Sequence, residues 1–248
     1  MIKYQLLTNK GLIREANEDA LVFKKKAIQS EDYYKEGSIL FNKFYACIFD
    51  GVGGEDFGEI ASLECAKAIA IRKKLVRGRK EFFDLLNELN ELVLALQKEK
   101  NNRRMMTTFC GVCVIGKTVR ATNVGDSCIY LFKNGNVIEK KSVDDTYKNQ
   151  LFKNGVKKED IDEEEVAHII TNCLGLGNFD KNKAHYFEFE FKKGDFVVLM
   201  SDGISDLLTP KELLEIIKEN KKESSLRIQK EIINRGAHDN YSLIILEA

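Results

Sequence analysis

The sequence is poor in the features that mark domain boundaries. It contains one proline, Pro210, in 248 residues, and it has no internal repeat and no low-complexity linker. A length of 248 residues suits one fairly large domain. We therefore expect a single domain over residues 1–248.

Long apolar runs are also absent. None approaches the roughly 20 residues that span a bilayer, and residues 1–8 do not have the profile of a signal peptide. These two absences predict a cytoplasmic protein with no membrane partner.

Net charge is absent too, because 39 basic and 39 acidic residues cancel. A neutral chain gives no reason to expect nucleic acid or an anionic membrane as a standing partner, so any charge effect must be local. The hydrophobic content of 44% and the charged content of 31% are those of an ordinary globular protein with a core to bury.

The six cysteines do not form an obvious disulfide or zinc pattern. Cys110 and Cys113 have C-x-x-C spacing, but they lie in a β-rich apolar run over residues 107–115. Side chains three apart on a strand point to opposite faces, which disfavours the alternative of a metal or redox role. We expect the remaining cysteines to be small buried hydrophobic residues, namely Cys47, Cys65, Cys128 and Cys173.

Runs of strands alternate with pairs of helices along the chain. Thr209 is typical of a helix N-cap, with Pro210 at the first helical position. Strands in runs and helices in pairs predict antiparallel sheets with helices packed outside them. The predicted strands cover residues 2–7, 44–49, 109–115, 119–123, 128–133, 184–191, 196–200 and 241–246, and the predicted helices cover 59–76, 80–99, 211–219 and 224–235.

Residues 140–172 differ from the rest of the chain. The segment is long and highly charged, and it contains the acidic run 159–165. One interpretation is a solvated helix. The other is a mobile, flap-like insertion beside an active site, because long excursions in compact domains are often functional.

Short acidic motifs occur near the ends of predicted strands. The buried-strand pattern of residues 44–49 leads directly into Asp50 and Gly51. A carboxylate at a strand end, followed by glycines that let the backbone approach a ligand, is a common way to present a metal site. Each motif alone is first of all a turn signal. The other motifs are Glu18-Asp19, Gly125-Asp126-Ser127, Ser201-Asp202-Gly203 and Asp239-Asn240.

The order of these motifs is more informative than any one of them. Arg-x-x-Asn-Glu-Asp, Asp-Gly-x-Gly-Gly, Gly-Asp-Ser, Ser-Asp-Gly and Asp-Asn follow one another in the chain. This succession resembles the metal-dependent protein phosphatase family, type 2C, especially its compact bacterial members, over residues 8–246. The resemblance implies an α+β fold in which two antiparallel sheets are sandwiched between pairs of helices, a four-layer αββα arrangement.

The resemblance also implies a set of metal ligands. Asp50 matches the carboxylate that bridges two cations, and the backbone carbonyl of Gly51 matches a ligand of one of them. Asp202 and Asp239 match the residues that complete the shell of the other cation. Glu18 matches the acidic ligand of the Gly51 cation, directly or through water.

Three further roles follow from the resemblance. Asp19 matches a residue that orients metal-bound water, and Asp126 matches one that binds a weaker third metal together with Asp202. Arg14 matches the arginine that grips the substrate phosphate, and a surface salt bridge is the alternative for it. Asp50, Asp19 and Arg14 are therefore the expected catalytic residues.

The implied chemistry is hydrolysis of phosphoserine or phosphothreonine on proteins. Hard oxygen ligands favour Mg or Mn. Two such ions about 3.5 to 4 Å apart lower the pKa of a bridging water, which attacks phosphorus in line without a covalent enzyme intermediate. The guanidinium fork of Arg14 would bind two phosphate oxygens at once, which a lysine could not copy.

One departure from the family pattern concerns the proton donor. Val52 stands where many eukaryotic members carry a histidine proposed as the general acid. Metal-bound water is our first candidate for this role, and His238 beside Asp239 is the second. His168 and His185 show no signal beyond their positions.

Other functions remain open. A pseudophosphatase would bind phosphoproteins without turnover, and an enzyme of this family could also serve one dedicated regulator. A calcium-binding structural domain is disfavoured because the acidic residues show no 12-residue EF-hand loop. The expected partners are phosphorylated protein substrates and an opposing Ser/Thr kinase, and we expect a monomer.

Overall fold

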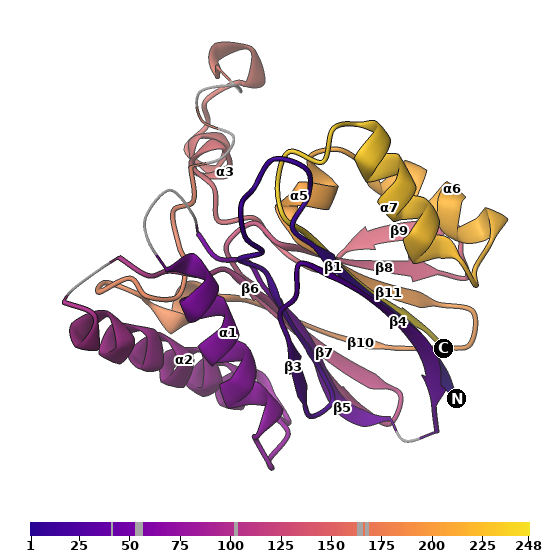
Figure 1. Cartoon of the computed structure of the whole chain (residues 1–248), viewed down its shortest axis with the longest axis horizontal. Helices are drawn as coiled ribbons and strands as arrows, with labels where there is room; N and C mark the ends of the chain where they lie inside the picture. The colour runs from indigo at the N-terminus through magenta and orange to yellow at the C-terminus, as the bar shows by residue number, and fades with distance from the viewer. Residues whose placement is uncertain (41, 53–56, 102–103, 163–165, 167–168) are drawn as a thin grey trace.

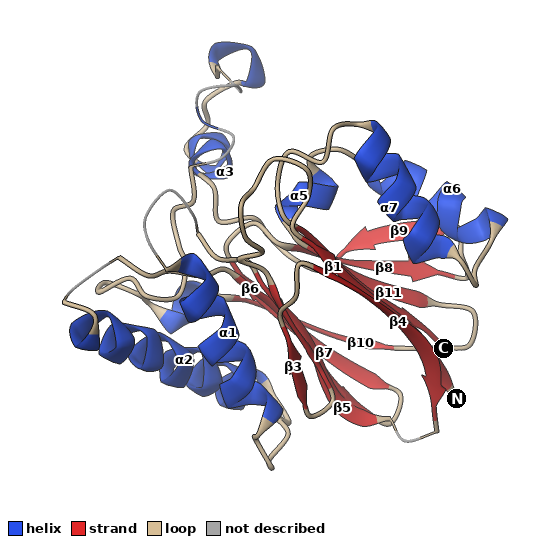
Figure 2. Cartoon of the chain, viewed as in Figure 1, coloured by secondary structure: helices blue, strands red, loops and turns tan. Residues whose placement is uncertain are grey.

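The computed structural model describes residues 1–40, 42–52, 57–101, 104–162, 166 and 169–248. Two antiparallel sheets of six strands each face one another, and helices cover their outer faces (Figure 1, Figure 2). The structure thus confirms the predicted α+β class with four layers. In the described part of the chain, no helix combines the length and the apolar character needed to cross a bilayer.

The first sheet contains both ends of the chain and has the order β4-β1-β12-β11-β8-β9. Its central strands are almost completely buried, whereas β4 is an edge strand with mostly exposed side chains. The strands are β1 (Ile2–Asn9), β4 (Asp32–Ile39), β8 (Cys128–Lys133), β9 (Val137–Lys140), β11 (Phe196–Met200) and β12 (Tyr241–Glu247).

The second sheet has the order β10-β7-β6-β5-β2-β3. Its strand β5 shows why the sheet is buried on both faces. Tyr45, Cys47 and Phe49 face the helices, while the alternate residues Phe44 and Ala46 face the other sheet. The strands are β2 (Ala20–Phe23), β3 (Lys26–Ile28), β5 (Lys43–Phe49), β6 (Phe109–Ile115), β7 (Thr118–Val124) and β10 (His185–Glu190).

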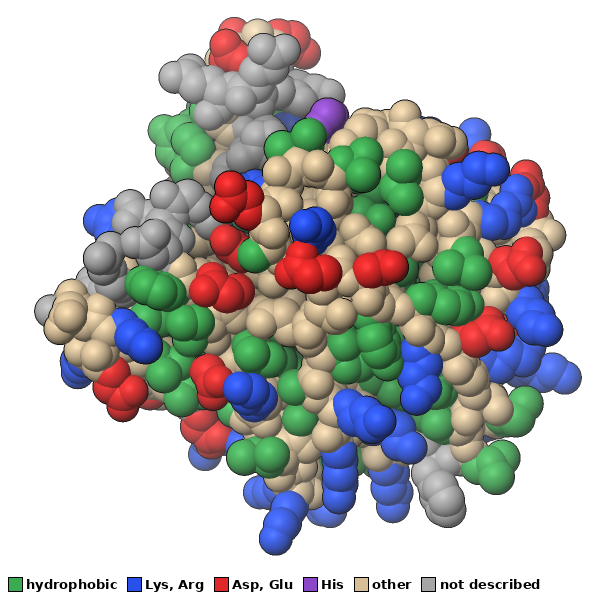
Figure 3. All heavy atoms as spheres, viewed as in Figure 1, with side chains coloured by type: hydrophobic (Ala, Val, Ile, Leu, Met, Phe, Trp, Pro, Cys, Tyr) green, Lys and Arg blue, Asp and Glu red, His purple; other side chains and the backbone are tan. Residues whose placement is uncertain are grey.

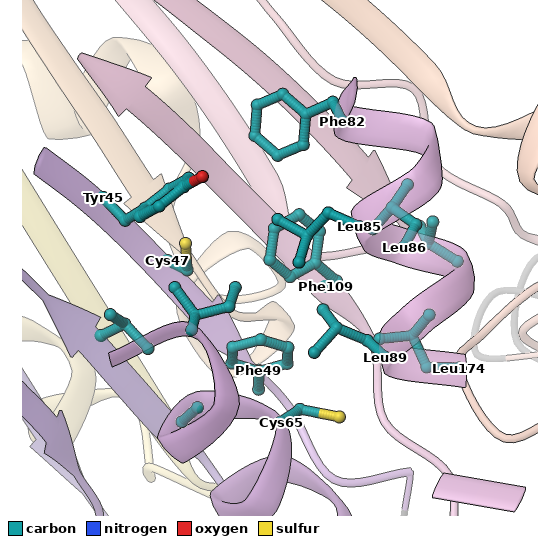
Figure 4. Packing of buried hydrophobic residues seen from close by; sticks show 14 of the residues in the cluster. Tyr45, Cys47, Phe49, Cys65, Phe82, Leu85, Leu86, Leu89, Phe109 and Leu174 are labelled. Carbon is teal, nitrogen blue, oxygen red and sulfur yellow. The ribbon is translucent and has the colours of Figure 1, made fainter. Parts of the chain in front are cut away.

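Helices α1 (Gly58–Ala70) and α2 (Arg79–Glu99) pack on the second sheet. Figure 4 shows this cluster, in which Phe82, Leu85 and Leu86 of α2 lie over Phe109. The first sheet is covered by the short α5 (Asp202–Ser205), α6 (Pro210–Glu219) and α7 (Ser224–Asn234). A third apolar cluster fills the space between the sheets.

Two expectations about helices have clear outcomes. The side chain and backbone of Thr209 form a capping box with Glu212, and Pro210 opens α6 as predicted. The predicted helix over residues 59–76 is too long, because α1 ends at Ala70. The cause is Val76, which is buried and donates its backbone N–H to the Tyr45 hydroxyl at 2.9 Å, so the chain leaves the helix to reach it.

All six cysteines are buried and free. Cys110 packs between the sheets, whereas Cys113 packs against the helices. The two side chains therefore lie on opposite faces of β6, as the strand interpretation predicts, and C-x-x-C chemistry is excluded.

The charged segment between β9 and β10 projects from the body of the molecule (Figure 1). It contains α3 (Tyr147–Lys153) and the short 3-10 helices Lys158–Asp160 and Lys181–Lys183. Asp145 anchors its base, since its carboxylate accepts the backbone N–H of Gly125 at 3.2 Å and lies 3.1 Å from His185 Nε2. Part of the acidic run, together with His168 and the motif glycines 53 and 54, lies outside the described residues.

Candidate metal centre

Segments that are distant in sequence meet at one end of the sandwich. Asp50 follows β5, and Asp202 follows β11, whose neighbour β12 begins just after Asp239. Together they border a cavity of about 390 Å³. Its described lining consists of Arg14, Glu18, Asp50, Gly51, Val52, Ile170, Asp202, His238, Asp239 and Asn240. Six of the eight predicted site residues are thus on one cavity.

The Ser-Asp-Gly and Asp-Asn motifs are brought together by close backbone contact. The Ser201 N–H donates to the Ser242 carbonyl at 3.1 Å, which extends the pairing of β11 with β12. A Cβ on Gly203 would lie 2.0 Å from the backbone oxygen of Asn240. Glycine is therefore needed at this position, and it lets Asp202 approach Asp239.

Asp19 lies behind the cavity and is completely buried. Its Oδ2 accepts a hydrogen bond from Ser201 Oγ at 2.8 Å, but its Oδ1 has no partner among the described residues. Burial raises the pKa of Asp19 to about 7. Because a buried carboxylate oxygen without a donor is costly, Asp19 fits a place beside a cation or an ordered water.

Asp50 and Asp202 form the most strongly perturbed part of the site. Burial, followed by repulsion from Asp202, raises the pKa of Asp50 well above its usual value. Burial also raises the pKa of Asp202 to about 7, with further repulsion from Asp126 and Asp239. These half-buried carboxylates, together with the buried Asp19, concentrate negative charge that a divalent cation would neutralise.

Glu18 is held in place through its backbone. Its N–H donates to Asn240 Oδ1 at 2.9 Å, and its carbonyl accepts the hydroxyl of Ser62 from α1. Burial, followed by repulsion from Glu59, raises the pKa of Glu18. The N-terminus of α1 thus lies against the predicted ligand, with Gly58 leaving room for its carboxylate.

Asn240 and Ser62 are positioning residues whose roles the sequence did not indicate. The Nδ2 group of Asn240 donates to the carbonyls of Lys10 and Ala16, which fixes the loop that carries Arg14. Asn240 was visible as part of the Asp-Asn motif, but its bonds to the first loop depend on tertiary structure. Ser62 had no signal at all, being one polar residue on a buried helix face.

Arg14 forms an ion pair with a predicted metal ligand. Its Nη2 lies 2.7 Å from Asp239 Oδ2, and the side chains are 48% and 37% exposed, respectively. This hydrogen bond is the main cause that raises the pKa of Arg14. The salt-bridge alternative for Arg14 is therefore realised, but at the rim of the candidate site, where a phosphate could compete for the guanidinium.

Asp126 lies beside the cavity and does not line it. Asp126 is half-buried, and its Oδ1 is buried without a hydrogen-bond partner among the described residues. Burial raises the pKa of Asp126 to about 6, and its charge acts on both Asp50 and Asp202. The residue is thus placed where it could share an ion with Asp202, at the base of the projecting segment.

The predicted metal ligands lie near one another but do not surround a single ion position. Within the described ranges, no three His, Cys, Asp or Glu side chains converge tightly enough to hold an ion as they stand. Asp239 is ion-paired with Arg14, so it would have to exchange this partner in order to act as the predicted metal ligand. The oxygen-rich donors suit Mg or Mn after this adjustment.

Two histidines receive different placements. His238 lines the cavity together with Val52 and remains a candidate proton donor. His185 contacts Asp145 instead and does not line the cavity.

The structure is a two-sheet sandwich covered by helices on both faces, with buried carboxylates at one end. The sequence motifs imply this fold and this kind of site, which are those of metal-dependent protein phosphatases. Residues 25–231 match the family model described as protein phosphatase 2C. The chain belongs to the protein phosphatase 2C family.

Curated relatives include bacterial serine/threonine phosphatases. The serine/threonine phosphatase stp of Listeria monocytogenes is 26% identical, over 97% of this chain and 93% of that protein. The serine/threonine protein phosphatase PstP of Mycobacterium tuberculosis is 24% identical, over 100% of this chain and 45% of that protein.

Solved structures share the fold. PstP/Ppp of Mycobacterium tuberculosis superposes with a TM-score of 0.82 at 22% identity, covering 100% of this chain and 99% of that chain. Stp1 of Staphylococcus aureus gives a TM-score of 0.80 at 22% identity, covering 100% and 95%. The catalytic domain of PstP in complex with two manganese ions gives a TM-score of 0.78 at 23% identity, covering 99% and 97%.

Proposed function

We propose that this chain is a metal-dependent protein serine/threonine phosphatase that acts on phosphoserine and phosphothreonine. The observation that carries the proposal is the gathering of Glu18, Asp50, Asp202 and Asp239 around one cavity beside Arg14. Family membership and the two manganese ions of the PstP structure support it.

The carboxylates would hold two ions of Mg or Mn. Asp50 would bridge them, with Glu18 and the Gly51 carbonyl toward one ion and Asp202 and Asp239 toward the other. When bound, these ions supply a water of lowered pKa and neutralise charge on the phosphoryl group.

Three residues would act around this pair of ions. Asp19, whose Oδ2 accepts a hydrogen bond from Ser201, would use its unpartnered Oδ1 to orient a water. Asp126 together with Asp202 could hold a third ion. Arg14 would leave Asp239 and bind two oxygens of the substrate phosphate, since its planar fork matches that geometry.

The test is hydrolysis of a phosphothreonine peptide and of p-nitrophenyl phosphate with Mn, with Mg and with EDTA. Asp50→Asn and Asp239→Asn should each lower turnover by more than about 100-fold, because each removes a ligand. Asp84→Asn is a matched control, since Asp84 pairs with Lys181 away from the cavity. Turnover that persists in EDTA would contradict the proposal.

A second candidate is a pseudophosphatase that binds phosphoproteins without turnover. The Arg14–Asp239 ion pair favours it, because the pair engages a predicted metal ligand and would compete with a cation for Asp239. A folded protein that binds the phosphothreonine peptide but shows no turnover with either metal would establish this function.

The substrate range distinguishes a general enzyme from one that serves a dedicated regulator. We propose phosphorylated proteins and an opposing Ser/Thr kinase as its partners. Comparable kcat/KM on several unrelated phosphopeptides would support a general enzyme. Activity confined to one phosphoprotein would indicate an enzyme that serves a dedicated regulator.

A further inference from the structure

A second cavity, of about 600 Å³, lies at the opposite end of the strands from the carboxylate cluster. Lys43 and Phe44 border it at the start of β5, whereas Asp50 follows the end of that strand. Seven residues of strand separate the two ends by roughly 20 Å. The second cavity is therefore distinct from the candidate metal centre, and we call it the basic cavity.

Its lining has one sign of charge. It contains six lysines and Arg72 but no aspartate or glutamate. None of the six ammonium groups forms an ion pair or hydrogen bond with the residues that the structure describes. The lysines are Lys24, Lys25, Lys26, Lys35, Lys43 and Lys73. In a chain with no net charge, this is a local concentration of unpaired positive charge.

The basic surface continues beyond this cavity. An adjoining cavity of about 410 Å³ shares Lys43 and Lys73 and adds Lys74 and Arg77. Figure 3 shows basic side chains gathered along the lower edge of the molecule, below the acidic group at the centre of that face. Two basic stretches of sequence, residues 24–26 and 72–77, meet in this surface.

The interior of the basic cavity is aromatic and apolar. The rings of Tyr4 and Phe23 pack against each other at a tilt of 38°, with centroids 4.3 Å apart, and Tyr33 and Ile39 remain partly exposed beside them. These side chains are the open end of the core between the two sheets. The hydroxyls of Tyr4 and Tyr33 have no hydrogen-bond partner in the described part of the chain, so both are available to a ligand.

We propose that the basic cavity binds a nucleoside polyphosphate. Its volume is that of a small-molecule site, its rings offer a stacking surface for a base, and its lysines supply point charges for several phosphates. An acidic peptide would pair with the lysines, but its carboxylates would provide no ring to stack on the aromatic side chains inside the cavity. A flat anionic membrane would not reach that interior.

Calorimetric titration of the whole chain with ATP and with inorganic tripolyphosphate tests the proposal. EDTA is present throughout, so that no divalent ion at the carboxylate cluster contributes. ATP should bind about 10-fold more tightly than tripolyphosphate, because stacking of one base is worth about 1–3 kcal/mol. The readout is independent of phosphatase turnover, so the proposal can fail or succeed separately from the proposed function.

Variants distinguish the contribution of the lysine charges to ATP binding from that of the aromatic side chains. Lys24→Glu with Lys73→Glu should weaken ATP binding by more than about 10-fold. Lys211→Glu with Lys230→Glu, on the exposed faces of α6 and α7, makes the same change in net charge and should leave binding unchanged. Tyr33→Leu keeps an apolar side chain and should weaken ATP but not tripolyphosphate.

Several results would overturn the proposal. These are no binding of ATP, equal affinity for ATP and tripolyphosphate, or the same loss in the control pair. Tighter binding of a polyglutamate peptide or of phosphatidylserine vesicles than of ATP would also overturn it and would identify the basic cavity as a site for that partner.

Discussion

Asp239 has two roles to reconcile in the candidate site, one observed and one predicted. It is ion-paired with Arg14 at 2.7 Å, and it is also the predicted ligand of a cation. A cation and a substrate phosphate would separate the pair, since each provides a new partner for one side. The ion pair therefore places Arg14, the predicted phosphate-binding residue, beside the predicted metal ligands.

Arg14→Lys should lower kcat/KM for a phosphothreonine peptide by more than about 10-fold. The reason is that lysine keeps the charge but loses the bidentate fork. Steady-state kinetics with Mn will measure this, with Arg79→Lys on α2 as the control. Equal losses in the two variants, or no loss in Arg14→Lys, would exclude a role in gripping phosphate.

The buried carboxylates predict how stability changes with pH in the metal-free protein. Burial raises the pKa of Asp19 and of Asp202 to about 7 in the folded state, above the value of 3.8 for a free aspartate. The folded state thus holds protons that the unfolded chain releases. Their contribution to stability is full below about pH 4 and is lost as the pH rises through about 7.

In EDTA, the Tm of Asp19→Asn relative to the Tm of wild type should therefore increase as the pH rises from 5 to 8, because asparagine has no charge to bury. Thermal melts in a pH series measure the difference. Asp84→Asn, which changes an exposed aspartate, should parallel wild type. A constant difference between Asp19→Asn and wild type across this range would refute the assignment.

At the scale of elements, the site depends on how β11 and β12 leave the first sheet. Gly203 follows β11 and touches the backbone of Asn240, while the Asn240 side chain holds the Arg14 loop. One close approach thus organises three of the motifs. The N-terminal half of α1 also positions the Glu18 motif, through the contacts of Ser62 and Gly58 with Glu18.

Gly203→Ala should destabilise the fold by about 2 kcal/mol or more and abolish turnover, because the new Cβ would meet a backbone atom that cannot rotate away. Chemical denaturation and phosphatase assays measure the two effects. Gly177→Ala is the control, since a Cβ there meets nothing within 4 Å. Similar stability of the two variants would show that the approach is not tight.

At the scale of the whole molecule, charge is segregated along the sandwich. The net charge is zero, yet carboxylates gather at one end, and lysines that have no ion-pair partner among the described residues gather at the other. A buried cluster of like charges opposes folding, and ions that bind it would add stability by mass action. The acidic end therefore predicts a protein whose stability depends on divalent cations.

Mn or Mg at neutral pH should raise the Tm of wild type, and a concentration 100 times the Kd corresponds to about 2.7 kcal/mol. The double variant Asp50→Asn with Asp239→Asn should show a much smaller shift. Differential scanning fluorimetry provides the measurement, with Ca as a comparison ion. A shift of equal size in the double variant would place the stabilising ion elsewhere.

The main strands and the four longest helices were predictable because each carries a repeating apolar pattern that sets its own conformation. The edge strand β4 was missed, because most of its side chains are exposed and its sequence shows no such pattern. The four-residue β2 was missed for the opposite reason, since its residues are all buried and the run is short. The end of α1 depends on a contact with Tyr45 that no local pattern contains.

The sequence by itself determined the fold class and the family, because the motifs and the apolar periodicity that indicate them can be read along the chain. Only the tertiary structure decided that Asp239 pairs with Arg14, that Asn240 and Ser62 hold the loops, and that two separate basic stretches enclose one cavity. These features depend on contacts between segments that are far apart in the sequence, in some cases by more than 200 residues. Sheet pairing and packing bring these segments together.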